Sequence, residues 1–262
     1  MKVQEEIESA IFGKSYKIDV LLPPSYGKQP EKHFPVVFSN DGQDFDKLGL
    51  PQILKTMYAD KLVPELVLVG VHAGERRQEY GVASQADYLE RGAQAGKYRD
   101  FFVKEFLPWA ENSYRISKEP ALRAIMGFSL GGLSALDIGW AQFQQFKYIG
   151  VFSGSFWWRS KSLEDGYKPS DRIMHRQLSS ESKKNLKIWL QSGGKDESND
   201  RDDDGLIDSI GDTLDLILVL QNLGYKLGKD LRYLDLPNAR HDMKAWSDAL
   251  PDFLRFCFSI RD

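Results

Sequence analysis

The stretch Arg123-Ala-Ile-Met-Gly-Phe-Ser-Leu-Gly-Gly-Leu133 decides the fold of this chain. A short apolar run leads into a G-x-S-x-G turn at residues 127–131, and a segment of good helix composition follows at once. Strand, sharp turn and helix in this order are typical of a nucleophile elbow, where a serine stands on a strained turn before a helix N-terminus. The pattern predicts that Ser129 is a nucleophile. A glycine-rich turn with a purely structural role is the alternative.

Apolar and β-branched runs recur along the whole chain. Eight of them are expected to be strands, at 6–12, 16–22, 35–39, 66–71, 121–126, 148–153, 186–191 and 231–236. Helical patterns are expected at 97–109, 133–143, 208–223 and 245–258. The short link at 13–15 predicts an antiparallel hairpin, and the helices between the later strands predict parallel βαβ units. We therefore expect one α/β domain over residues 1–262, with a mostly parallel central sheet of about eight strands.

The overall composition is that of a globular protein without unusual charge. Of the 262 residues 42% are hydrophobic, and the net charge is -3. No basic block stands out, so we expect no nucleic-acid partner. No apolar run is long enough to span a bilayer, and the N-terminus shows no signal peptide. The expectation is a cytoplasmic protein, or an exported one whose signal has been removed.

A serine hydroxyl needs a base to become a good nucleophile, and the chain has four histidines. His241 lies between the last expected strand and the C-terminal helix, so its loop returns to the carboxyl edge of the sheet beside the elbow. His33 precedes its strand and falls at the opposite edge. His175 lies in an irregular segment and His72 ends a strand. We expect His241 to be the base, with a capping or surface role as the alternative.

The carboxylate that orients this base is expected after the strand at 186–191. Asp196 and Glu197 follow two glycines there, which gives the chain order serine, acid, histidine of α/β-hydrolases. Asp196 is preferred and Glu197 is the rival, while a solvated loop carboxylate is the alternative for either. The oxyanion is expected to bind two backbone N–H groups, those of Leu130 and Gln43.

Four motifs, read together, indicate a family: Leu22-Pro-Pro-Ser-Tyr26, Phe38-Ser-Asn-Asp-Gly-Gln43, Gly127-Phe-Ser-Leu-Gly-Gly132 and Ser153-Gly-Ser-Phe-Trp-Trp158. This ordered set resembles the putative esterase family, which includes enterochelin esterases, esterase D, feruloyl esterase modules and the antigen 85 mycolyltransferases. The resemblance implies an α/β-hydrolase without a large cap domain, with Ser129 and His241 catalytic and an oxyanion amide at Gln43. The loop before His241 departs from the family, because Ala239 and Arg240 stand where members often have glycine.

Residues 200–212 align with an EF-hand-type calcium loop. The aligned metal ligands are Asp200, Asp202, Asp204, the carbonyl of Leu206, and Asp208. Gly205 takes the position of the sharp turn, but Gly211 stands where the bidentate glutamate belongs. The loop predicts a structural Ca²⁺ that would hold the segment beginning at Asp196, with no cofactor for the chemistry itself. A solvated acidic loop is the alternative.

Two long segments without clear periodicity, 72–96 and 156–184, follow strands and are expected to form the pocket walls. Arg76, Glu79 and Arg91 fall in the first without an assigned role. Trp157 and Trp158 in the second are expected to stack on a sugar or an aromatic acyl group, with ordinary packing as the alternative.

Together these features predict a serine esterase that hydrolyses a carboxylic ester through an acyl-enzyme. A small-molecule or carbohydrate ester is the expected partner, and sugar, feruloyl and siderophore esters all remain open as substrates. An acyltransferase on the same scaffold and a non-catalytic, calcium-dependent binding module are the alternatives.

Overall fold

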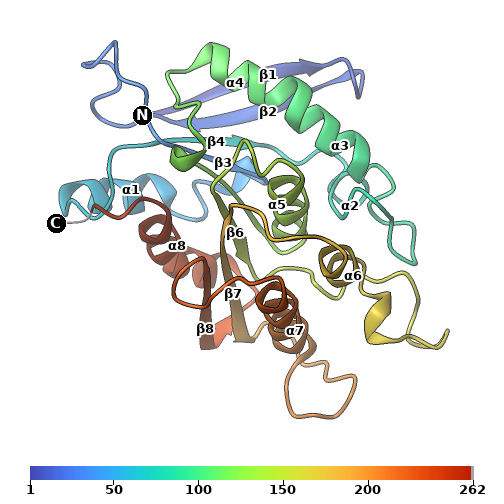
Figure 1. Ribbon diagram of the computed structural model, residues 1–262. Helices are drawn as coiled ribbons and strands as arrows, with labels where there is room; N and C mark the ends of the chain where they lie inside the picture. Colours follow the sequence, from blue (N-terminus) through green and yellow to red (C-terminus); the bar gives the residue numbers. More distant parts are fainter. Residues whose placement is uncertain (261–262) are drawn as a thin grey trace.

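The computed structural model describes residues 1–260, and over that range eight strands form one sheet (Figure 1). The strands lie in the order β1-β2-β4-β3-β5-β6-β7-β8. Their bounds are β1 Lys2–Ser9, β2 Lys14–Leu21, β3 Val36–Ser39, β4 Val67–Val71, β5 Arg123–Phe128, β6 Tyr148–Phe152, β7 Lys187–Lys195 and β8 Leu231–Arg240. The pairs β1–β2 and β2–β4 are antiparallel, and every later pair is parallel. The mostly parallel sheet with an N-terminal antiparallel hairpin is confirmed.

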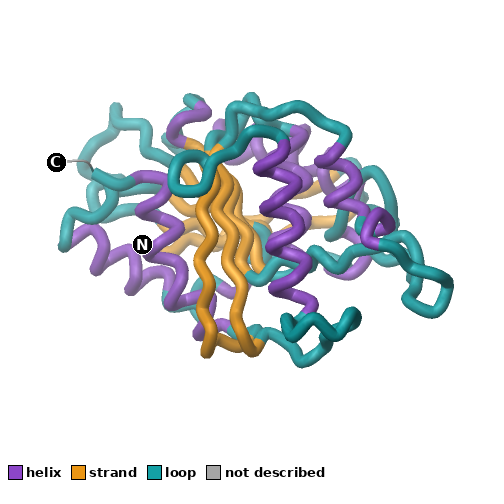
Figure 2. Tube along the Cα trace, turned by 60° about the horizontal axis from the view of Figure 1, so that its bottom comes forward, coloured by secondary structure: helices purple, strands orange, loops and turns teal. Residues whose placement is uncertain are grey.

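Helices cover both faces of the sheet, which therefore lies between two layers (Figure 2). One layer holds α3 (Ala95–Phe101), the π-helical turn η2 (Phe102–Phe106), α4 (Leu107–Ser113), α5 (Leu130–Ala141), α6 (Ile173–Ser179) and α7 (Asp208–Asn222). The other holds α1 (Leu50–Ala59) and α8 (Met243–Phe258). The remaining short elements are η1 (Gly42–Asp44), α2 (Arg76–Glu79), η3 (Pro120–Leu122) and η4 (Pro169–Asp171).

The alternating side chains of the central strands explain the two layers. In β3, Val36 and Phe38 pack beneath the first layer, and Val37 packs beneath the second. Strands buried on both faces read as continuous apolar runs, which is why the sequence predicts them well. None of the helices in residues 1–260 combines the length and the apolar character needed to cross a membrane.

The expected bounds of the first strand are wrong. β1 covers Lys2–Ser9 rather than 6–12, and the hairpin turns at residues 10–13 rather than 13–15. The first strand was predicted too far along the chain because Ile11 and Phe12 are apolar, but these two residues lie in the turn. Phe12 packs edge-on against the ring of Phe101 there, with 6.2 Å between centroids. Tertiary packing rather than strand pairing therefore explains why these residues are apolar.

Besides the four-residue α2, the helices α1 and α6 were not expected from the sequence. In α1, Leu50, Leu54 and Met57 form a buried stripe at helical spacing, just after the left-handed residue Gly49. Helix α6 lies within the segment 156–184, which was expected to be irregular. Both are short and amphipathic over two to three turns, so periodicity alone gave a weak signal for them.

Candidate active site

Ser129 lies on the sharp turn between β5 and α5. Its backbone dihedrals are φ 54° and ψ -122°, a conformation that costs free energy in a residue other than glycine. Gly127 permits the turn, because a Cβ atom on that residue would overlap the carbonyl group of Gly131. The strand, the strained serine and the helix that begins at Leu130 have the strand–turn–helix geometry expected of this stretch.

Asp196 and His241 lie together at the same, carboxyl edge of the sheet. The Asp196 carboxylate is only 1% exposed, and its Oδ2 accepts a hydrogen bond from the backbone N–H of Gly193 at 3.0 Å. Its Oδ1 lies 3.9 Å from Nδ1 of His241 and is buried, with no hydrogen-bond partner among the described residues. A buried acceptor without a donor is costly, so a small movement of the imidazole toward Oδ1 would be favourable.

The irregular pairing of β7 with β8 brings these two residues together. The register shifts between Gly193 and Lys195, at the end of β7. A Cβ atom on Gly193 would lie 2.6 Å from the carbonyl oxygen of Ala239 and 2.6 Å from Oδ1 of Asp196. Only glycine therefore lets the strand before Asp196 approach the strand before His241 this closely.

Trp246, in the first turns of α8, connects this pair to the nucleophile. Its indole lies edge-on to the His241 ring at 5.2 Å between centroids, and it packs against the ring of Phe128 at 5.3 Å. Its Nε1 donates to Oγ of Ser153 at 3.1 Å. Since Phe128 directly precedes Ser129, one buried side chain bridges the imidazole and the elbow.

Arg76 joins the elbow to the loop that follows β3. Its Nε and Nη2 donate to the two carboxylate oxygens of Asp41 at 3.0 and 3.1 Å, and Nη2 also donates to the carbonyl of Phe128 at 3.1 Å. Burial lowers the pKa of His241, Asp196 raises it, and the nearby Arg76 cation lowers it again, with a net decrease. His241 is thus held in the neutral form that a general base requires. Of the residues that the sequence left unassigned, Arg76 is the one that reaches this site.

The hydroxyl of Ser129 makes no hydrogen bond to His241 within residues 1–260. Its nearest hydroxyl partner is Oγ of Ser155, at 3.4 Å. Catalytic hydrogen bonds are often long or misaligned without substrate, so this geometry agrees with a resting state. Ser155 had no assigned role in the sequence analysis, although it belongs to the Ser153–Trp158 motif.

The two expected oxyanion donors each lie in the first turn of a helix. Leu130 is the first residue of α5 and Gln43 is the second of η1, positions at which backbone N–H groups have no acceptor within the helix. The Gln43 side chain is fixed, because Nε2 donates to Oδ1 of Asp41 at 3.1 Å and Oε1 accepts from the N–H of Ala73 at 3.0 Å. Asp41 itself has φ 58°, which turns the chain into η1.

The rival acid and the two tryptophans lie elsewhere around the site. Glu197 accepts from Nδ2 of Asn199 at 3.3 Å, and burial raises its pKa. No contact between Glu197 and the His241 ring is found in the described part of the chain, whereas Oδ1 of Asp196 lies 3.9 Å from Nδ1 of His241. Trp157 is half-buried and lines a cavity, but Trp158 is 0% exposed and belongs to the core. The expected ligand contact is therefore corrected for Trp158, which packs beneath Gly81 and Gly92.

The other three histidines lie outside the proposed triad, each in its own environment. His175 is buried between α6 and α7, where its Nε2 lies 2.8 Å from the carbonyl oxygen of Asp212, and burial lowers its pKa to about 4. His72 lies 3.2 Å from the buried carboxylate of Asp19, at the end of β4. His33 is exposed, ahead of β3.

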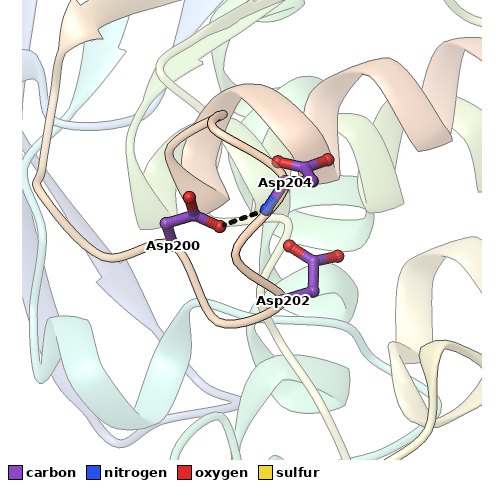
Figure 3. Close-up of side chains that lie close together, drawn as sticks. All are labelled: Asp200, Asp202 and Asp204. Atoms are coloured by element: carbon purple, nitrogen blue, oxygen red, sulfur yellow. Dashed lines mark hydrogen bonds between the residues drawn. The ribbon is translucent and has the colours of Figure 1, made fainter.

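The expected calcium loop projects from the molecule ahead of α7 (Figure 1). Carboxylate oxygens of Asp200, Asp202 and Asp204 lie within 4.8 Å of one another (Figure 3). Asp200 also accepts the N–H groups of Asp204 and Gly205, at 3.2 and 3.0 Å, and these two hydrogen bonds close the turn of the loop.

Asp208, the fourth carboxylate that was expected to bind the metal, interacts with an arginine instead. Asp208 pairs with the Arg201 guanidinium at 3.3 Å and accepts the Arg201 backbone N–H at 2.9 Å. Arg201 also binds the buried Asp212. The repulsion among the acidic residues is therefore partly relieved by an arginine within the loop. Three carboxylates lie together instead of four, and Asp208 is the ligand that differs from the expectation.

The family model named Putative esterase matches residues 9–257 of this chain. The chain belongs to the putative esterase family. This membership confirms the resemblance drawn from the four motifs and places the chain among enzymes classed as carboxylic ester hydrolases.

Two curated relatives match over about half of the chain. The uncharacterized protein YbbA of Bacillus subtilis is 30% identical over 148 residues, which are 55% of this chain and 58% of YbbA. Esterase Rv1288 of Mycobacterium tuberculosis is 25% identical over 155 residues, 56% of this chain and 30% of that protein. The matched stretch is thus well under two thirds of each relative.

Solved structures match over nearly the whole chain. A ferulic acid esterase is 19% identical with a TM-score of 0.75, and 98% of each chain is covered. The enterobactin esterase of Shigella flexneri, solved in the presence of enterobactin, is 16% identical with a TM-score of 0.77, and 98% of this chain and 58% of that one are covered. These likenesses confirm the α/β-hydrolase fold.

Proposed function

We propose that this protein is a serine esterase that hydrolyses a carboxylic ester through Ser129, His241 and Asp196. The supporting observation is the meeting of three distant loops at one edge of the sheet. A strained serine lies at that edge, and so does an imidazole whose Nδ1 is 3.9 Å from a buried carboxylate oxygen that has no hydrogen-bond partner among residues 1–260. Family membership supports an ester as the bond that is cleaved.

Each residue has a distinct role in this reaction. Ser129 Oγ attacks the ester carbonyl carbon while Nε2 of His241 accepts its proton. The alcohol leaves with that proton, and the acyl group stays on the serine. Water then attacks the acyl carbon with His241 again as the base, and the carboxylic acid is released. Asp196 accepts the Nδ1–H, which sets the tautomer and stabilises the imidazolium as it forms.

The backbone N–H groups of Leu130 and Gln43 are the proposed oxyanion donors. Such groups are worth the most where negative charge develops in a site that excludes water, on the order of 3 kcal/mol each. Arg76 supports this arrangement, because it binds both Asp41, two residues before Gln43, and the carbonyl before the nucleophile. Loss of Arg76 would loosen both sides of the oxyanion site.

We propose a small-molecule or carbohydrate ester as substrate. Two solved neighbours carry ferulic acid and enterobactin in their names, which supports feruloyl and siderophore esters as the first compounds to assay, together with acetylated sugars. If the protein hydrolyses one of these three classes of ester in preference to the others, that preference identifies its substrate class.

The test of this function is Ser129→Ala with p-nitrophenyl acetate. We expect kcat/KM to fall by about 10⁴-fold or more, because the nucleophile is lost, with an unchanged Tm. Ser134→Ala, in the same helix α5, is the matched control and should keep its activity. Labelling by a fluorophosphonate probe should occur in the native chain and not in Ser129→Ala. Retained turnover in Ser129→Ala would reject the assignment, and absence of both turnover and labelling in the native chain would favour a binding module.

A further inference from the structure

A cavity of about 430 Å³ is lined in part by residues that closely follow the proposed site in the chain. One of its walls is formed by Trp157, two residues after Ser155, whose hydroxyl is the neighbour of Ser129. Glu197, the residue after Asp196, also lines the cavity. Trp157 and Glu197 therefore each lie within two residues of a side chain of the proposed site, which makes this cavity the candidate place for a group attached to the bound ester.

Arg159 lines the cavity with its guanidinium largely unused. Among residues 1–260 no carboxylate lies within ion-pair distance of it, and its only hydrogen bond is from Nη1 to the carbonyl of Trp157, at 3.4 Å. Its Nε is buried without a partner. A guanidinium carries five N–H donors, so most of its hydrogen-bonding capacity is available to a ligand.

The position of Arg159 is nevertheless well defined. Its guanidinium lies 5.0 Å from the centroid of the Tyr88 ring and 5.7 Å from that of Tyr167. Its backbone carbonyl accepts the N–H of Tyr88 at 3.0 Å. Trp157 is held in turn by the Arg91 cation, 4.8 Å from its ring centroid. A cation fixed in advance between aromatic rings loses little side-chain entropy when it binds an anion.

The other charged groups of this cavity already have partners. Arg201 is paired with Asp208 at 3.3 Å and also with Asp212. Asp200 accepts two backbone N–H groups of its own loop. Glu197 accepts a hydrogen bond from Nδ2 of Asn199. Of the two arginines on the cavity wall, Arg159 is thus the one without a carboxylate partner among the described residues.

We propose that this cavity binds a free carboxylate of the substrate through Arg159, with Trp157 contacting the chain between that carboxylate and the ester. The proposal rests on the esterase function above and names its substrate class: esters that carry a second, unesterified carboxylate. A planar guanidinium pairs with a carboxylate in a two-pronged fashion, which an ammonium group cannot reproduce.

The experiment compares matched esters that differ in this carboxylate. On the acyl side the pair is the mono-p-nitrophenyl ester of adipic acid and p-nitrophenyl hexanoate. On the alcohol side the pair is 4-acetoxybenzoate and p-tolyl acetate. We expect Arg159→Gln to lower kcat/KM for the anionic member of one pair by about tenfold or more, the effect of losing one charge-assisted contact. The neutral member should change by less than about twofold.

Two further variants make the result specific. Arg159→Lys keeps the charge and loses the fork, so it should recover only part of the preference. Arg176→Gln removes a surface arginine of α6 that binds Gln85, and it should behave as the native chain. The pair that responds identifies the side of the ester that enters the cavity.

The proposal is overturned if Arg159→Gln affects the anionic and neutral esters equally in both pairs. Direct titration of monomethyl adipate into Ser129→Ala, with and without Arg159→Gln, separates this result from failure of the esterase function. If the protein hydrolyses no ester but binds monomethyl adipate in a way that depends on Arg159, the proposed esterase function is rejected. The proposed carboxylate site in the cavity is then retained. If the protein hydrolyses neutral esters and Arg159 affects neither turnover nor binding, the carboxylate site is rejected and the esterase function is retained.

Discussion

The environment of a single imidazole determines how the proposed reaction depends on pH. His241 must be neutral to accept a proton, and it is protonated below its pKa. Burial and the Arg76 cation lower that pKa below its ordinary value of 6.5, against the opposing effect of Asp196. The acidic limb of kcat/KM for p-nitrophenyl acetate should therefore have its midpoint below pH 6.5, and activity should persist into mildly acidic solution.

Removal of the Arg76 cation tests this explanation. Arg76→Gln should move the acidic limb to higher pH, because one cause of the lowered pKa disappears. The position of the limb, and not its height, is the readout, since loss of the Asp41 contacts also reduces the rate. Arg77→Gln changes the adjacent exposed residue and should leave the limb in place. A limb that stays at the same pH in Arg76→Gln would show that the cation does not act on His241.

The two adjacent carboxylates at 196 and 197 should contribute very differently to turnover. We expect Asp196→Asn to reduce kcat for p-nitrophenyl acetate by about 10³- to 10⁴-fold, because the amide stabilises the wrong tautomer and not the imidazolium. Glu197→Gln should change kcat by less than about threefold, since that side chain bonds Asn199 instead of His241. Steady-state kinetics of both variants decide between them, and the opposite ranking would transfer the acid role to Glu197.

At the scale of elements, the loop between β7 and α7 links the acid to an acidic turn. We propose a structural calcium ion there, and the grouping of Asp200, Asp202 and Asp204 is the feature that supports it. At a calcium concentration 100-fold above Kd, the free energy of unfolding should rise by about 2.7 kcal/mol and Tm by about 5–10 °C. EGTA should reverse the shift in a thermal melt.

A pair of neighbouring variants separates specific binding from general charge effects. Asp202→Asn removes one grouped carboxylate and should abolish the calcium-dependent shift in Tm. Asp203→Asn makes the same charge change one residue away, at a position with φ 54° that asparagine tolerates, and should keep the shift. Equal melting curves in calcium and in EGTA for the native chain would reject the metal and leave a solvated loop stabilised by Arg201.

The sequence predicted best what depends on local pattern. The apolar strands from β3 to β7 and the strand–turn–helix at Ser129 could both be read from neighbouring residues. The 3.9 Å contact of Asp196 with His241 could not, because it depends on the register shift between β7 and β8. The hairpin bounds failed for a related reason, since Phe12 is apolar to pack against Phe101 and not to pair in a strand.

At the scale of the whole molecule, the layer of α1 and α8 on one face of the sheet supports the proposed site through α8. Helix α8 begins two residues after His241 and carries Trp246, which contacts the imidazole. Farther along α8, Phe253 packs against Phe152 and Trp189, with 5.7 and 5.6 Å between ring centroids. The depth at which α8 sits on the sheet therefore bears on both stability and the position of the base.

Two glycine-to-alanine changes test this coupling. A Cβ atom on Gly150, in β6, would overlap the ring of Phe253, so Gly150→Ala should lower the free energy of unfolding by about 1–3 kcal/mol and push α8 outward. Because α8 carries Trp246, kcat/KM should fall as well. Gly211→Ala places the same methyl group in α7, where nothing lies within 4 Å, and should raise stability by about 0.5–1 kcal/mol with unchanged activity. Urea unfolding and ester hydrolysis, measured on both variants, give the comparison. If Gly150→Ala is destabilised but fully active, the position of His241 does not depend on how closely α8 packs on the sheet. The loop after β8 must then position His241 alone.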